Sequence, residues 1–207
     1  MLVLAGVGLF LVLGRGGGGG IPILGGGRSD EVPAFDFVVR KARAVPTAEG
    51  ADAKSLTEDA DAVAKELTPI LDDLFTTAFL DPGAWGDGDY AAVWERFTAD
   101  ARPSAEQSVE TLTLGASAGD VYESVTPKRG VLSYEVLFDA DGAPASVVAT
   151  FSFSALGART DGTYTAIVSS GQLFLGNPGD WRITAFEVRR DDRTARPPAS
   201  PTPSPTT

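Results

Sequence analysis

The feature that most constrains the fold is the stretch at residues 55–101, which reads SLTEDADAVAKELTPILDDLFTTAFLDPGAWGDGDYAAVWERFTADA. From Val63 to Phe79 its apolar residues recur at three- and four-residue steps, which predicts one long amphipathic helix. Pro69 lies inside this pattern and predicts a kink or a division of the helix. The Asp-Pro-Gly sequence at 81–83 predicts a tight corner that ends it. An apolar stripe of this length has to pack against another layer, which the rest of the chain must supply.

Further helical segments are expected after the corner. Asp89 is a suitable N-cap for a second helix, whose face would carry Tyr90, Trp94 and Phe97. Ser104 followed by a Gln three residues later resembles a capping box and predicts a short third helix over 104–112. One more helical turn is expected over 120–125.

The second half of the chain has the alternating pattern of β-strands. Each expected strand has one apolar and one more polar face, and short turns rich in Gly, Asp and Asn separate them, as in an antiparallel meander. Another strand is expected before the long helix. We therefore predict an α+β fold in which N-terminal helices pack on a curved antiparallel sheet. The expected strands cover residues 35–45, 131–138, 146–156, 163–175 and 181–189.

The ends of the chain differ in composition from its middle. Residues 1–14 are almost wholly apolar up to Leu13, and such a run serves either as the core of a signal peptide or as a membrane anchor. We favour an uncleaved anchor, because no basic residue precedes the run and no small-x-small cleavage site follows it. Residues 15–29 are a glycine-rich linker, and residues 194–207 a disordered Pro/Ser/Thr tail. The folded domain is thus expected over 30–193.

Composition excludes several classes of function. The chain has no cysteine and no histidine, which removes disulfides, thiol nucleophiles, Ser-His triads and most zinc sites. Its formal net charge of -11 disfavours nucleic acid as a partner. We predict no catalytic residue, no metal site and no cofactor.

Carboxylates are the catalytic groups that this composition leaves, and two places in the sequence are candidates for such a role. Asp139 and Asp141 lie in a DxDG sequence that superficially resembles a calcium loop. The glycine comes at the fourth place rather than the sixth, and Thr150 occupies the twelfth place where a bidentate Glu is needed. A hairpin turn explains the sequence better. Glu135 could act as a general base if it were buried, but the alternation of its strand places it on the polar face.

Aromatic residues at helical and strand spacing could fill the core or line a pocket between helices and sheet. Core packing is the default interpretation, and a pocket is the functional alternative. The candidate pocket-lining residues are Tyr90, Trp94, Phe97, Tyr134, Phe151, Phe153 and Trp181.

Four phrases carry a resemblance to a known family: AFLDPGAWGDGDYAAVWERF, LTLG, VLFDADGAPASVVATFSF and SGQLFLGNPGDWRITAFEVRRDD. Together with the order of helices and strands, they resemble actinobacterial membrane-anchored proteins of uncharacterised function with an NTF2-like (SnoaL or Mce-associated-like) domain. The resemblance covers about residues 34–192 and implies a cone fold behind a single N-terminal anchor. It carries over no catalytic residue, because none of the constellations of NTF2-like enzymes can be matched here.

Three functions follow as hypotheses. The first is a non-enzymatic extracytoplasmic domain, tethered to the cell membrane by a single span, that binds a protein partner or a second copy through its sheet face in envelope assembly or transport. The second is a binding module for an apolar small molecule or lipid in the cone cavity. The third is a cavity enzyme of isomerase or hydrolase type that uses carboxylates and tyrosine. A filled apolar interior would favour the first, an open apolar cavity the second, and convergent polar groups the third.

Overall fold

A computed structural model describes residues 31–46, 53–176 and 179–198, and the side chains from residue 56 onward within the second range. The predicted anchor at 1–14, most of the linker at 15–29 and its neighbour Asp30, and the tail beyond residue 198 lie outside the described residues. Within these ranges, no helix has the length and apolar character needed to cross a membrane.

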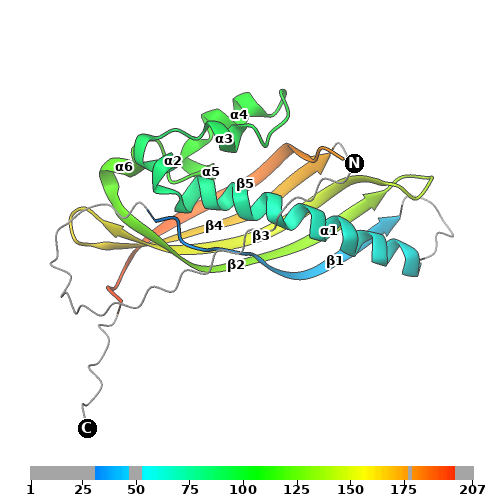
Figure 1. Cartoon of the computed structure of the whole chain (residues 1–207), viewed down its shortest axis with the longest axis horizontal. Coiled ribbons are helices and arrows are strands. Elements are labelled where there is room, and N and C mark those ends of the chain that lie inside the picture. Colours follow the sequence, from blue (N-terminus) through cyan, green and yellow to red (C-terminus); the bar gives the residue numbers. More distant parts are fainter. Residues whose placement is uncertain (1–30, 47–52, 177–178, 199–207) are drawn as a thin grey trace, which may run out of the picture.

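A single five-stranded sheet runs through the described part of the chain, in the order β1-β2-β3-β4-β5 (Figure 1). The last four strands form the expected antiparallel meander. In the tight turn between the first two of them, the Asp139 carboxylate accepts hydrogen bonds from the backbone of Asp141 and Ala143, and Gly142 has a φ of 80°. The hairpin interpretation of the DxDG sequence is therefore confirmed. The strands are β1 (Val38–Pro46), β2 (Tyr122–Phe138), β3 (Pro144–Arg159), β4 (Tyr164–Gly176) and β5 (Arg182–Ala195).

The prediction of a wholly antiparallel sheet is wrong, because β1 pairs with β2 in parallel. The sheet is therefore mixed. All the helices of the described residues lie between these two strands in the sequence, and a crossover of that length permits a parallel return. Apolar residues alternate in the same way in parallel and antiparallel strands, so the sequence pattern could not distinguish the two kinds of pairing.

Helices cover one face of this sheet, as Figure 1 shows for α1. In the strands β2 to β4, buried residues alternate with partly or fully exposed ones, which leaves the other face uncovered by the described residues. The helical elements are α1 (Ala53–Phe75), the π-helix η1 (Thr76–Leu80), α2 (Pro82–Asp87), α3 (Ala91–Trp94), α4 (Arg102–Gln107), α5 (Val109–Leu112) and α6 (Ala118–Val121).

The long helix α1 forms as expected, but Pro69 does not divide it. The irregular turn comes later, where the Asp81 N–H donates to the Thr76 carbonyl five residues back, as in a π-helix. Asp81 then caps α2 by accepting a hydrogen bond from the Gly83 N–H at 2.8 Å, with Pro82 at the first helical position. The expected corner is therefore itself a short helix.

The later helices are shorter than predicted. The second helix stops at Trp94, because the chain leaves it to form a bridge between Phe97 and Ile183 on β5. The third is broken into α4 and α5 around Ser108. The helical turn expected over 120–125 is wrong from Tyr122 onward, where β2 begins.

Large aromatic side chains fill the space between α1 and the sheet. Phe153, fully buried on β3, has ring centroids of Phe35, Phe75 and Phe79 at 5.3, 5.5 and 5.0 Å. A glycine in β2 makes room for this cluster: a Cβ on Gly130 would lie 2.4 Å from the Phe35 ring. The strand residues that sequence alternation placed on the apolar faces of β2 and β3 all lie in this core.

Candidate functional site

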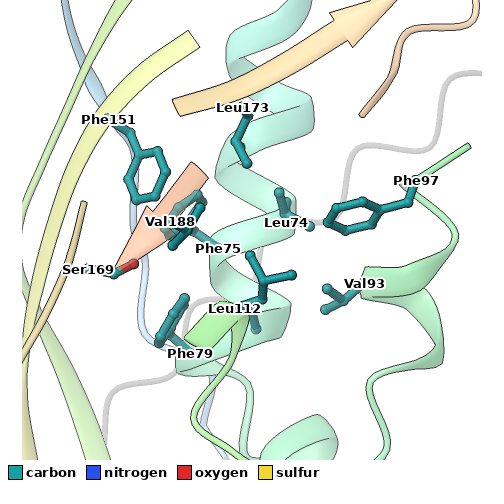
Figure 2. A pocket seen from close by; sticks show the side chains of 11 residues that line it. Leu74, Phe75, Phe79, Val93, Phe97, Leu112, Phe151, Ser169, Leu173 and Val188 are labelled. Atoms are coloured by element: carbon teal, nitrogen blue, oxygen red, sulfur yellow. The ribbon is translucent and has the colours of Figure 1, made fainter. Parts of the chain in front are cut away.

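The candidate binding site is a small hollow between the helices and the strands β3 to β5 (Figure 2). Its volume is about 20 Å³, which is room for about one water molecule. The wall is apolar except for one serine. It consists of Leu74, Phe75, Ala78, Phe79, Val93, Phe97, Leu112, Phe151, Ser169, Leu173 and Val188.

The hollow exists because β4 has small residues at two successive inward positions. Ser169 pairs with Phe153 on β3, and Gly171 pairs with Phe151 on one side and Val188 on the other. A side chain at Gly171 is excluded, since a Cβ there would lie 2.0 Å from the Glu187 carbonyl oxygen. The side chains of the helices do not fill the space that these two small residues leave.

Ser169 is the polar group in this wall. It is 1 % exposed, and its Oγ has no hydrogen-bond partner. Figure 2 shows this oxygen pointing into the space bounded by Phe75, Phe79 and Val188. Burying an unpaired hydroxyl costs about 1–3 kcal/mol. Ser169 is not among the residues predicted from the sequence, although its place in the alternation of Ile167, Ser169 and Leu173 would have identified a hydroxyl on the inner face.

Two of the seven candidate pocket residues, Phe97 and Phe151, line this hollow. The other five lie elsewhere: Tyr134 and Phe153 are fully buried in the core. Trp94 is half-buried, with its ring 6.2 Å from those of Tyr90 and Phe97. The candidate set therefore divides into two wall residues and five packing residues: Tyr90, Trp94, Tyr134, Phe153 and Trp181.

Two of the three buried tyrosines, Tyr90 and Tyr134, have structural hydrogen bonds through their hydroxyls. The Tyr90 hydroxyl donates to the Gly115 carbonyl at 3.0 Å, which fixes the LTLG turn. The Tyr134 hydroxyl lies 3.0 Å from the Thr68 hydroxyl on α1. Neither hydroxyl lines the hollow. Burial raises the pKa of Tyr90 and of Tyr134 to about 12.

These shifts predict how stability depends on alkaline pH. Because both phenols bind their protons more tightly when folded, they contribute stability below pH 10, the usual pKa, and lose it as the pH rises through about 12. Tyrosinate absorbance should therefore show that two of the four tyrosines ionise only around pH 12, together with unfolding. Tyr134→Phe should remove one of these late ionisations. Ionisation of all four near pH 10 with the fold intact would contradict this expectation.

A largely buried arginine joins the helical layer to β5 at the sheet edge. Arg190 on β5 donates to the carbonyls of Thr113 at 2.7 Å and Glu110 at 3.2 Å, and its guanidinium pairs with Asp192. Burial works against its charge, but the hydrogen bond to Asp192 and the electrostatic attraction of Asp192, Tyr122 and Glu110 together outweigh this and raise the pKa of Arg190 above its ordinary value. The guanidinium of Arg190 therefore has its hydrogen-bond and ion-pair partners within the protein, and its role is structural.

No carboxylate or tyrosine lines the hollow among the described residues, and nowhere in that part of the chain do three His, Cys, Asp or Glu residues gather as metal ligands would. Comparison with protein-family models, with curated proteins and with solved structures found no match. The chain's own elements therefore define the architecture: an α+β fold with a five-strand mixed sheet and helices on one face.

Proposed function

We propose that this chain is a membrane-tethered, extracytoplasmic and non-enzymatic domain of the NTF2-like type, which mediates protein interaction in envelope assembly or transport. A long helix laid across a four-strand antiparallel meander supports the NTF2-like assignment. The apolar run from Met1 to Leu13 and the glycine-rich linker support the tether.

The observation that carries the proposal is the contrast between the two faces of the sheet. Between the helices and the strands β3 to β5 the inner face is almost completely filled, with a hollow of only about 20 Å³, whereas pockets for small molecules usually measure about 300–1,000 Å³. The outer face is open and offers surface for a partner.

Half-buried apolar side chains lie on this open face, and charged residues flank them on the outer strands. Val148 and Phe174 are directly paired across β3 and β4, in the same row as Glu135 on β2. An apolar centre with a polar rim is typical of protein interfaces. The half-buried apolar residues of the open face include Val131, Leu137, Val148, Leu156, Val168 and Phe174.

Site-specific photocrosslinking in the full-length chain tests this proposal. A benzophenone side chain at Phe174 should form discrete cross-linked products with a partner protein or a second copy. The same group at Glu66, exposed on α1, is the matched control and should not give those products. Identical products from both positions, or none from Phe174, would refute binding through the open face.

A second candidate function, binding of a small apolar ligand with one hydrogen-bonding group, is favoured by the unpaired Ser169 hydroxyl. If the hollow is empty, Ser169→Ala should raise the free energy of unfolding by about 1 kcal/mol, because it removes an unsatisfied buried group. Urea unfolding followed by tryptophan fluorescence measures this, with Ser152→Ala on the outer face as the control. A loss of stability would instead mean that the hydroxyl has a partner in the hollow, which would favour this second function.

A further inference from the structure

The strand β1 has a free edge. It pairs with β2 on one side, and no described segment pairs with its other side. About half of the N–H and C=O groups of such a strand point outward and can accept another strand. Val38 and Val39, at its start, are 65 % and 39 % exposed, which is unusual for large apolar residues in the described part of this chain.

An open groove runs beside this edge, between β1 and the helix α1. Its volume is about 450 Å³, and its lining is Val39, Asp61, Ala64, Lys65, Thr68 and Pro69. The next inward residues of β1 after Val39 are the small, half-buried Ala42 and Ala44. A strand added to β1 would therefore find space for its inward side chains against α1.

Pro69 adds a feature to the wall of the groove. Because proline has no N–H, the carbonyl of Lys65 lacks the donor that an α-helix supplies four residues later. Lys65 and Pro69 both line the groove. The helix therefore has an acceptor without its usual donor in the wall that faces β1.

The basic residues around the free edge of β1 indicate which kind of strand could bind there. Arg40, at the irregularity of β1, together with Lys41 and Lys65, takes part in no ion pair with any described residue. Arg43 has only a long, exposed contact of 3.8 Å with Glu135. This cluster of cations stands out in a chain whose net charge is -11.

The same cations argue against a second copy at this edge. Pairing two β1 strands would bring Arg40, Lys41 and Arg43 of one copy close to those of the other, and like charges across a strand pair are destabilising. Basic residues and bulges on edge strands commonly prevent self-association in this way. They leave the edge open to a segment of opposite charge.

We propose that the free edge of β1 and the groove beside α1 bind an extended acidic segment of a partner protein by strand addition. Backbone hydrogen bonds along β1 supply affinity, alternate apolar side chains enter the groove, and the acidic side chains between them meet Arg40 and Lys41. This surface is distinct from the open face of the sheet, so it adds to the proposed function.

Fluorescence anisotropy with the full-length chain tests the proposal. The probe is a short labelled peptide that alternates valine and glutamate, and the control peptide has lysine in place of glutamate. We expect saturable binding of the acidic peptide, about tenfold tighter than that of the basic one. The double variant Arg40→Glu/Lys41→Glu should reverse this preference, whereas Arg189→Glu on the opposite edge strand should not.

Two further peptides separate strand addition from simple charge attraction. In each peptide, alternate backbone nitrogens are methylated. One peptide thereby loses the N–H donors along one edge of its strand, and the other loses the N–H donors along the opposite edge. One of them should lose binding while the other keeps it. Equal binding of both, or no saturable binding of the acidic peptide, would overturn the inference. Cross-linking at Phe174 that persists in either case would leave the proposed function standing.

Discussion

Phe153→Ala is expected to lower the free energy of unfolding by about 3–5 kcal/mol. The side chain is fully buried on β3, and its ring lies 5.0–5.5 Å from those of Phe35, Phe75 and Phe79. Truncation removes these contacts and leaves a cavity that rigid neighbours on β2 and α1 cannot close. Urea unfolding followed by tryptophan fluorescence measures the loss, provided that the variant retains the wild-type circular dichroism spectrum.

Ser152→Ala is the matched control, since Ser152 is the neighbouring residue on the exposed face of the same strand. Its effect should stay within about 0.5 kcal/mol. A cost for Phe153→Ala as small as that of the control would mean that the aromatic cluster is loosely packed. Phe153 would then have to be reconsidered as a pocket residue.

Arg190→Leu is expected to lower the free energy of unfolding by about 3 kcal/mol. The variant leaves Asp192 without its partner and removes the donors to the carbonyls of Thr113 and Glu110. Removing one partner of a buried pair costs about 3–5 kcal/mol, and the lower end applies because the Asp192 side chain is 30 % exposed. Chemical denaturation measures this difference.

The chain contains its own control for this experiment. Arg193 pairs with Asp191, also two residues away, but on the outer face of β5, and both side chains are more than half exposed. Arg193→Leu makes the same chemical change where water solvates both charges, so it should have little effect on stability. Equal effects of the two variants would show that Arg190 does not hold the helical layer to β5.

Local chemistry explains which elements could be predicted. The apolar stripe of α1 and the alternation in β2 to β5 gave these elements their type and their buried faces, because burial of one face imposes a fixed period. The Asp-Gly turns placed the hairpins. The predicted strands were too short: β2 already begins at Tyr122, and β5 continues to Ala195, which lies inside the expected tail. The strand expected over residues 35–45 is β1, which covers Val38–Pro46.

The candidate site could be predicted only in part. Aromatic periodicity identified residues that face inward, but whether an inward ring fills or lines a space depends on what packs against it. Phe97 and Phe151 reach the hollow, whereas Tyr134 and Phe153 are enclosed. Alternation along β4 could have placed the Ser169 hydroxyl on the inner face, but its lack of a hydrogen-bond partner depends on neighbours that only the tertiary structure brings together.

Sequence alone determined the amphipathic helix, the meander, the absence of histidine and cysteine chemistry, and the position of Glu135 on the outer, more polar face of the sheet. These depend on residue type and on short-range periodicity. Tertiary structure decided the parallel placement of β1, the break-up of the helices after Trp94, and the near-complete filling of the space beneath them. Each of these depends on contacts between residues far apart in the chain, such as Phe97 with Ile183 and Val38 with Val131. Local periodicity contains no information about such contacts.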